Sequence, residues 1–285
     1  KMEKKIIFSS STQVSKNNSY GKSKKVCEKL LLNLAKKNNS KVFILRLPNI
    51  YGKWSKPNYN SAVSTFCNNI ANNKRINISN PKKILNLLYI DDLIKIFKKL
   101  IDKKNSKRKN IIIKFNNTKK ISLKKLADTI YDLENKRNQF YIGDISSDFK
   151  RKLYSTYVTY LPKSKISYLL KSHKDERGSF TEFLKTLRSG QFSFFTAKKG
   201  KIRGHHFHHS KVEKFLVLKG KAKFNLENIS NNKKISFKLD GAIPKVVESI
   251  PGHQHYIQNT GKEELLVLIW SNEIFDVNNP DTFRI

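Results

Sequence analysis

Six of the chain's seven histidines fall within two short segments, residues 203–213 and 251–259. Both lie where short apolar runs alternate with glycines and polar turns, a pattern that predicts antiparallel strands. Residues two apart on a strand share a face, so His206 and His208 can point the same way. Glu213 opens the next apolar run, and His255 belongs to a separate one. The spacing therefore predicts an all-β jelly roll that gathers these four side chains in its interior.

Three imidazoles and one carboxylate with an open coordination position suit a divalent metal. Zinc is the first expectation, with iron, manganese and nickel as alternatives. The predicted ligands are His206, His208, Glu213 and His255. A surface histidine cluster without metal is the alternative. His205 and His209 repeat the letters of the motif, so a shift of one residue would change which imidazoles face inward. His253, on a Pro-Gly turn, is expected to face outward.

The spacing His-x-His-x₄-Glu-x₆-Gly from His206 onward, followed by Pro-Gly-x-x-His-x₃-Asn, resembles the two motifs of the cupin family. The resemblance covers residues 165–285 and implies a cupin jelly roll there. The segment Asp-Glu-Arg-Gly-Ser-Phe-Thr-Glu, which begins at Asp175, resembles the opening of sugar-nucleotide epimerase cupins. That resemblance implies that Arg177 contacts a substrate phosphate, for which a bidentate guanidinium is suited.

The N-terminal part carries the pattern of an open α/β sheet. An apolar run at 4–8 ends in four hydroxyl side chains, which predicts a buried parallel strand with functional groups at its end. A helix is expected from about Ser19, followed by a second strand at 41–45. The apolar stripe of that helix is predicted to comprise Val26, Leu30, Leu31 and Leu34.

Tyr20 and Lys24 are four residues apart, which places them on one face of the predicted helix, one turn from each other. An ammonium beside a phenol favours the phenolate form, so the pair can transfer a proton. A serine or threonine hydroxyl near the end of the first strand can meanwhile hydrogen-bond a substrate carbonyl or alcohol.

A strand, Ser-Ser-Ser-Thr, Tyr-x-x-x-Lys, a second strand and Arg-x-x-Asn-x-Tyr-Gly follow one another in this order. The series resembles the sugar-nucleotide branch of the extended short-chain dehydrogenase/reductase family. The resemblance implies a Rossmann-like α/β domain over residues 1–160. It also implies that Tyr20 is the general acid/base and that Lys24 is its partner and a contact of the nicotinamide ribose.

The same resemblance implies a polarising hydroxyl and a substrate contact. Ser11 takes the first role, with Ser10 or Thr12 as alternatives because the triple serine leaves the register open by one residue. Asn49 matches the position that contacts the sugar nucleotide. The segment 86–92 resembles the part of the substrate domain in which an acidic pair follows a short strand and opens a helix. The alternative is that this pair only balances the helix dipole.

Members of that family hold the dinucleotide pyrophosphate in a glycine-rich strand–turn–helix about a hundred residues before the serine, and no such motif occurs in this sequence. The sequence also begins with Lys1 rather than Met. We therefore expect the C-terminal portion of a longer enzyme that uses NADP(H) or NAD(H). The N-terminal portion alone is expected to be poor in cofactor and inactive.

Over essentially the whole chain, the combination resembles the CapF-type family of bifunctional capsular-polysaccharide enzymes, which segments 54–60, 270–276 and 279–282 also suit. The resemblance implies inversion at C3 of a UDP-2-acetamido-2,6-dideoxy-4-hexulose by the cupin, then NADPH-dependent reduction at C4 in the full-length enzyme. The alternative is a fragment of an NAD(P)-dependent sugar-nucleotide epimerase or dehydratase with a structural, non-catalytic cupin. The expected partners are the UDP-sugar substrate and a second copy in a homodimer.

Charge, cysteine content and apolar runs show whether the chain is a nucleic-acid-binding protein, a disulfide scaffold or a membrane protein. Lys and Arg total 58 against 22 Asp and Glu, but only nine of the 58 are Arg, and the lysines are spread along the chain. Nucleic-acid readers concentrate arginine on one face, so a nucleic-acid partner is not expected. Two cysteines argue against a disulfide scaffold and favour a reducing cytoplasm. No apolar run approaches the ~18 residues of a membrane span.

Overall fold

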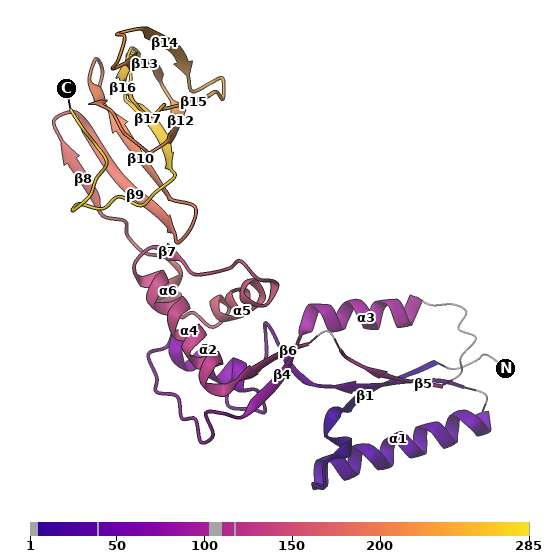
Figure 1. Cartoon of the computed structure of the whole chain (residues 1–285). Coiled ribbons are helices and arrows are strands. Elements are labelled where there is room, and N and C mark those ends of the chain that lie inside the picture. The colour runs from indigo at the N-terminus through magenta and orange to yellow at the C-terminus, as the bar shows by residue number, and fades with distance from the viewer. Residues whose placement is uncertain (1–4, 39, 103–109, 117, 285) are drawn as a thin grey trace. The chain divides into compact units, whose positions relative to one another are not determined.

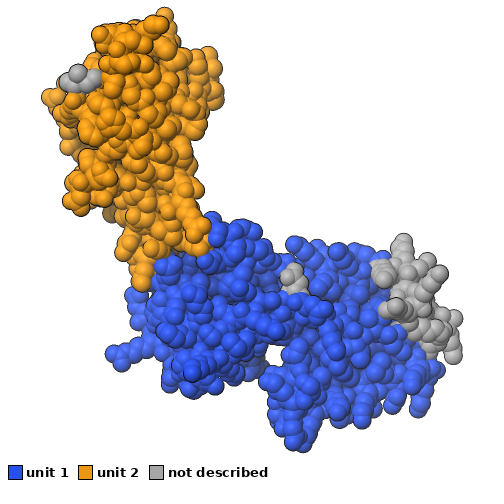
Figure 2. All heavy atoms as spheres, in the orientation of Figure 1, with its two compact units in different colours: residues 1–134, 145–166 blue, residues 135–144, 167–285 orange. Residues whose placement is uncertain are grey.

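The computed structural model describes residues 5–38, 40–102, 110–116 and 118–284. The chain forms two compact units, one comprising residues 1–134 and 145–166, the other residues 135–144 and 167–285 (Figure 2). Unit 1 combines helices with mainly parallel strands, whereas unit 2 consists mainly of antiparallel strands (Figure 1).

The first sheet of unit 1 is parallel, with the order β1 (Lys5–Ser11), β2 (Lys41–Leu47), β5 (Asn110–Lys114). In β2, Val42 and Ile44 pack with α1 (Ser19–Asn38), whereas Phe43 and Leu45 pack with α3 (Ile90–Asp102). All four are buried, as expected for a central strand covered on both faces. The two helices thus cover opposite faces of a Rossmann-like sheet (Figure 1).

The predicted succession of strand, helix and strand is confirmed, although β1 is longer than its apolar run. Pairing with β2 continues through the serines as far as Ser11, which lies opposite Leu47. The hydroxyl side chains therefore sit on the last residues of the strand itself. Lys4, at the start of the predicted run, lies outside the described residues.

The buried face of α1 differs from the predicted stripe. Val26, Leu30 and Leu34 are 55%, 63% and 42% exposed. Of the four predicted residues, only Leu31 packs against the sheet, together with Leu32 and Ala35.

A charged residue accounts for this error. Glu28 lies on the inward face of α1 and is buried, because it binds the guanidinium of Arg46 in β2 and the hydroxyl of Ser10 in β1. Because Glu28 is charged, apolar spacing alone does not identify its side of α1 as the buried one.

The second sheet of unit 1 has the order β3 (Asn49–Tyr51), β4 (Ile84–Tyr89), β6 (Lys119–Ser122). The remaining helices are η1 (Thr12–Ser15), α2 (Ala62–Ala71), α4 (Leu123–Asn138), α5 (Asp148–Val158) and α6 (Lys163–Ile166). Phe66, Leu126 and Leu153 join α2, α4 and α5 to this sheet in one core. Among the described residues, no helix is both long and apolar enough to cross a membrane.

Unit 2 is a β-sandwich. One sheet has the order β15-β12-β17-β10-β9-β7, with β8 added on β9, and the other has the order β11-β16-β13-β14. The strands are β7 (Tyr141–Ile142), β8 (Ser172–Asp175), β9 (Gly178–Thr186), β10 (Gln191–Ala197), β11 (Ile202–His206), β12 (Glu213–Lys219), β13 (Lys221–Asn228), β14 (Lys234–Asp240), β15 (Val246–Glu248), β16 (His253–Asn259) and β17 (Leu265–Ser271).

The two sheets share one apolar core, to which Phe215 and Val267 contribute from the first sheet and Phe224 and Ile257 from the second. The apolar runs at 191–195, 214–218, 221–225 and 264–270, whose sequence pattern predicts strands, lie in β10, β12, β13 and β17. β7 pairs in parallel with β9, which explains why residues 135–144 belong to unit 2.

Candidate functional site

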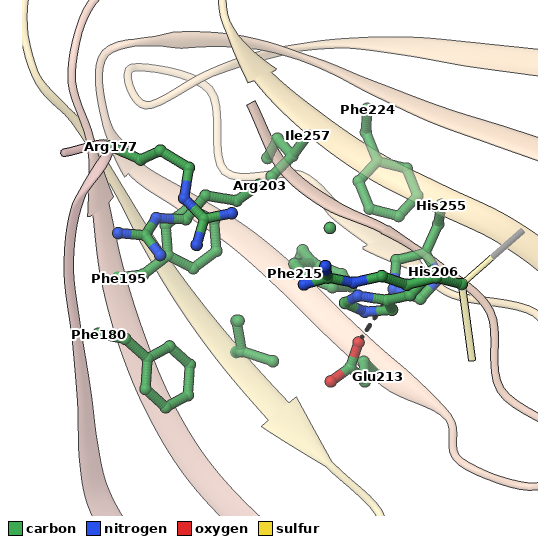
Figure 3. Close-up of a pocket in the computed structure, with 13 residues that line it drawn as sticks. Arg177, Phe180, Phe195, Arg203, His206, Glu213, Phe215, Phe224, His255 and Ile257 are labelled. Atoms are coloured by element: carbon green, nitrogen blue, oxygen red, sulfur yellow. Dashed lines mark hydrogen bonds and ion pairs between the residues drawn. The ribbon is translucent and has the colours of Figure 1, made fainter. Parts of the chain in front are cut away.

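Four side chains converge between the sheets of unit 2, and Figure 3 shows three of them, His206, Glu213 and His255. His206, His208, Glu213 and His255 each present a ligand atom, and these atoms lie within 4.8 Å of one another. Nε2 of His208 and Nε2 of His255 lie 3.3 and 3.2 Å from the same oxygen of Glu213, Oε2. His208 and His255 are each only 2% exposed. The structure thus brings together the four residues predicted as metal ligands.

Both sheets contribute to this cluster. His206, the last residue of β11, is paired with His255 in β16. Glu213, the first residue of β12, approaches from the other sheet. Three of the four side chains are therefore held by regular strands, which favours a fixed geometry.

A β-bulge decides which histidine of the first segment faces inward. The pairing register shifts between Gly204 and His206, and His205 between them has a φ of 63°. His205 is exposed and stacks on Tyr256, with ring centroids 4.3 Å apart. His205, His209 and His253 all lie outside the cluster.

The predicted reason for the convergence of His206 and His208 is wrong. β11 ends at His206, so the two are not alternate residues of one strand. His208 follows in a loop, and its Nδ1 lies 2.5 Å from the carbonyl oxygen of Asp281. Because a carbonyl only accepts, Nδ1 carries a proton and, in the neutral ring, Nε2 is an acceptor that faces Glu213.

The charges in the cluster suit a divalent cation. Burial, with a smaller contribution from the neighbouring His255, lowers the pKa of His206 to about 4, so its imidazole is neutral at neutral pH. Burial raises the pKa of Glu213, whereas a proton on Nε2 of His208 or His255, donated to the carboxylate, holds this pKa below its usual range. When Nε2 of His208 carries no proton and Glu213 is ionised, two acceptors face each other. A proton or a cation must then lie between them.

The donor set itself fits a metal. Imidazole nitrogens with one carboxylate are typical ligands of zinc and other divalent transition metals. Nδ1 of His255 is buried without a hydrogen-bond partner, so this nitrogen is available to bind a polar group or an ion. His206, His208, Glu213 and His255 therefore form a candidate metal centre.

A cavity of about 230 Å³ opens beside the cluster and is lined on one side by His206, Glu213 and His255. Figure 3 shows the guanidinium groups of Arg177 and Arg203 across the cavity from His206. Arg284 also lines it. This arrangement places a positively charged region next to the candidate metal centre, which suits an anionic ligand such as a phosphate.

Asp175 holds two of these arginines. Its carboxylate accepts hydrogen bonds from Nε and Nη2 of Arg177, at 3.1 and 2.6 Å, and from Nη2 of Arg203, at 3.1 Å. These contacts lower the pKa of Asp175 to about 2, and the hydrogen bond from Arg177 contributes most. The predicted phosphate contact, Arg177, thus reaches the cavity with its orientation set by a carboxylate.

A second cavity, of about 480 Å³, reaches the cluster along another path and is also lined by His206 and Glu213. Lys211 contributes to its wall and is only 4% exposed. The Lys211 ammonium donates to Oγ1 of Thr282 at 3.3 Å and to the carbonyl of Pro280. A buried cation therefore accompanies the histidines.

In unit 1, the predicted proton-transfer pair lies in the first turns of α1. Nζ of Lys24 donates to the carbonyl oxygen of Ser9 at 3.0 Å and lies 5.7 Å from the centroid of the Tyr20 ring. Tyr20 is half exposed. A phenol beside an ammonium and open to solvent can exchange a proton with a ligand.

The three candidate hydroxyl residues differ in their partners. Ser10 donates to Glu28 at 2.5 Å on the packed side of α1, so its hydroxyl is already engaged. Ser11 accepts from the backbone amide of Gln13 at 3.1 Å and caps η1. Thr12 is exposed. These contacts favour Ser11 or Thr12 over Ser10 as the polarising hydroxyl.

Gly21 brings η1 close to the turn that carries Tyr20. A Cβ atom at Gly21 would lie 2.2 Å from the carbonyl oxygen of Gln13, so only glycine permits this approach. The side chain of Asn18 caps α1 by accepting from the Gly21 amide at 2.7 Å. The end of β1 and the start of α1 are thereby joined.

The predicted sugar-nucleotide contact, Asn49, is exposed at the start of β3 and donates to the carbonyl oxygen of Asn86 at 3.3 Å. Asp91 and Asp92 open α3, as the pattern predicts. They bind Lys53 at 3.1 Å and Lys152 at 2.5 Å, respectively. The Lys53 contact lowers the pKa of Asp91. The acidic pair thus engages lysines of other segments in addition to the helix dipole.

Sequence reasoning missed Arg203, Arg284, Lys211 and Asp281. Arg203 had a local signal, since Arg-Gly directly precedes the first histidines. Asp281 lies in segment 279–282, which carries part of the family resemblance, but nothing in the sequence indicated its contact with His208, because the two residues are 73 apart and meet only in the fold.

Comparison with known proteins assigns both units. Residues 2–114 match the NAD dependent epimerase/dehydratase family, and residues 173–283 match the polysaccharide biosynthesis C-terminal domain. The UDP-2-acetamido-2,6-beta-L-arabino-hexul-4-ose reductase of Pseudomonas aeruginosa is 43% identical over 278 residues, which cover 98% of this chain and 74% of the reductase.

Solved structures give the same result. The capsular polysaccharide assembling protein CapF from Staphylococcus aureus is 37% identical with a TM-score of 0.92, over 98% of this chain and 76% of CapF. CapF with the inhibitor 3-isopropenyl-tropolone is 36% identical with a TM-score of 0.86. The match covers 98% of this chain and 78% of that CapF chain. The chain therefore belongs to the CapF family of nucleotide-sugar epimerases and reductases of polysaccharide biosynthesis.

Proposed function

We propose that this chain acts on a UDP-2-acetamido-2,6-dideoxy-4-hexulose, inverting C3 in unit 2 and taking part in NADPH-dependent reduction of the C4 ketone in unit 1. The observation that carries the proposal is the convergence of three histidines and Glu213 beside an arginine-lined cavity. The name of the Pseudomonas relative, a reductase of a UDP-linked hexul-4-ose, supports the substrate class.

In unit 2, we assign a cupin fold with one divalent ion, zinc by preference, held by His206, His208, Glu213 and His255. Such an ion can polarise a carbonyl oxygen. A tropolone carries adjacent carbonyl and hydroxyl oxygens, a chelating pair for divalent cations. The inhibitor of the Staphylococcus protein is therefore a suitable competitor with which to probe this centre.

The chemistry at C3 follows from the neighbouring ketone. The C4 carbonyl acidifies the C3 proton, so a base removes it, the enolate oxygen is stabilised, and a proton returns to the opposite face of C3. Arg177, oriented by Asp175, contacts the substrate diphosphate at the positive side of the cavity. The sugar is thereby directed toward the histidine cluster.

In unit 1, Tyr20 delivers the proton that the C4 alkoxide acquires on reduction, and the Lys24 ammonium lies beside its ring. Ser11 polarises the C4 carbonyl, and Asn49 contacts the sugar nucleotide. NADPH supplies the hydride when it is bound. The open position of the phenol beside the Lys24 ammonium supports this assignment.

We also assign a homodimer. The exposed apolar residues Val26, Leu30 and Leu34 follow one another at four-residue intervals along one side of α1. A second copy that covers this stripe would remove it from water.

Deuterium exchange at C3 tests the function. The zinc-loaded chain in D₂O should incorporate deuterium at C3 of the 4-hexulose, and His206→Ala and His208→Ala should abolish this exchange. His205→Ala, at an exposed position of the same segment, should retain it. No exchange above background with the loaded wild type would contradict the proposal. Variants that lose assembly but retain exchange would indicate a structural cupin.

A further inference from the structure

The end of the chain is bound to the loop that carries His208. Phe207 and Phe283 exchange backbone hydrogen bonds in both directions, at 2.9 and 3.0 Å. Residues 280–283 therefore run alongside residues 207–211. This contact joins segments that are far apart in the sequence at the edge of the histidine cluster.

Asp281 is the centre of this contact. Oδ1 of its carboxylate accepts from the amide of His209 at 3.0 Å. Oδ2 accepts from the amide and hydroxyl of Ser210, both at 2.9 Å, and from the amide of Lys211 at 2.8 Å. One side chain thus holds three successive backbone amides of the loop directly after His208.

The backbone of Asp281 acts on His208 itself, because its carbonyl oxygen lies 2.5 Å from Nδ1 of that ring. Asp281 has a φ of 38°, a conformation that asparagine and aspartate tolerate better than most residues. On either side of it, Pro280 and Thr282 bind the ammonium of Lys211. These three consecutive residues therefore orient an imidazole of the cluster and a buried cation beside it.

We infer that Asp281 is a positioning residue for the candidate metal centre. It holds the His208 ring with its proton on Nδ1 and its Nε2 directed at Glu213. The metal part of this inference rests on the proposed function. Groups that bind the second nitrogen of a ligating histidine fix its tautomer and orientation, and their loss typically weakens metal binding about tenfold to a hundredfold.

Asp281→Asn is the sharpest variant, because asparagine accepts the same backbone conformation. Its amide nitrogen cannot accept hydrogen bonds, so at least one of the four donors of the loop loses its partner. Asp276→Asn is the matched control, since Asp276 lies in the same C-terminal segment and its carboxylate accepts from the amide of Asn278 at 2.9 Å. In a chelator competition, zinc affinity should fall about tenfold to a hundredfold in Asp281→Asn and stay unchanged in Asp276→Asn.

The proton on His208 provides a readout that general destabilisation does not mimic. Nitrogen-15 correlation spectra of the metal-free wild type should show a proton on Nδ1 of His208, and Asp281→Asn should lose this preference. A wild-type ring protonated on Nε2 alone would overturn the inference, whether or not the variant folds. Wild-type zinc affinity together with an unchanged His208 ring in Asp281→Asn would also overturn it.

The two proposals can fail separately. A wild type that binds no divalent metal would contradict the metal centre of the proposed function. The protonation of His208 is measured without metal, so it would still decide whether Asp281 orients this ring.

Discussion

His206 of β11 and His255 of β16 face each other across two paired strands, with ring centroids 4.7 Å apart and ring planes at 88°. Both rings are held by an antiparallel ladder, and Glu213 meets His255 from the opposite sheet. The geometry of the cluster is therefore set mainly by the sandwich and does not depend on a ligand to assemble it.

Zinc should stabilise unit 2 through these residues. A ligand that binds only the folded state adds about 2.7 kcal/mol to the free energy of unfolding at a concentration of a hundred times its Kd. His255→Ala should remove this gain in a calorimetric melt. His253→Ala, on the same strand but outside the cluster, should retain it. An equal zinc-dependent gain in both variants would contradict the ligand assignment.

The buried Glu28 should make unit 1 sensitive to acid. Burial alone would raise its pKa, but hydrogen bonds from Arg46 and Ser10 outweigh burial and lower it from the ordinary 4.5. The contribution to stability is therefore complete above pH 4.5 and is lost as the pH falls toward the folded-state pKa. In Glu28→Gln, the midpoint of urea unfolding should fall at neutral pH and depend less on pH below 4.5. A pH dependence identical to that of the wild type would exclude this role.

Tyr20→Phe should separate the two proposed reactions. Removing a proton donor of this kind typically costs about 10²–10⁴-fold in rate. NADPH-dependent reduction at C4, measured with this substitution in an enzyme that contains the glycine-rich cofactor motif, should fall by that factor, whereas deuterium exchange at C3 should be unchanged. Tyr59→Phe, at an exposed tyrosine of the same unit, serves as the control. Equal loss of both reactions would argue against separate roles for the units.

The exposed stripe of α1 predicts the position of the dimer contact. Leu30→Glu places a charge in the middle of this stripe and should shift the protein toward a monomer in sedimentation velocity. Ile101→Glu, which changes a similarly exposed apolar residue of α3, should leave the mass unchanged. A dimer of undiminished affinity in Leu30→Glu would place the contact elsewhere.

The sequence predicted several of the strands and the helix with Tyr20 and Lys24, and it singled out the four residues of the histidine cluster. These features depend on local spacing, because alternation and glycine positions are properties of neighbouring residues. The predicted inward face of α1 was wrong because Glu28, a charged residue, lies on the face that is actually buried.

The inward orientation of His208 could not have been found in this way. It depends on the carbonyl of Asp281, 73 residues away, and on a bulge that turns His205 outward. Such contacts between distant segments leave no periodic signal in the sequence. The sequence thus singled out four residues that the fold brings together, whereas the strand alternation assumed for His206 and His208 is not what places them.

Anomalous diffraction at the zinc absorption edge, from crystals grown with zinc, would show whether the histidine cluster of unit 2 binds the metal. An anomalous peak is expected within bonding distance of ligand atoms from His206, His208, Glu213 and His255. Zinc bound only elsewhere, with these four side chains in contact with one another alone, would contradict this expectation.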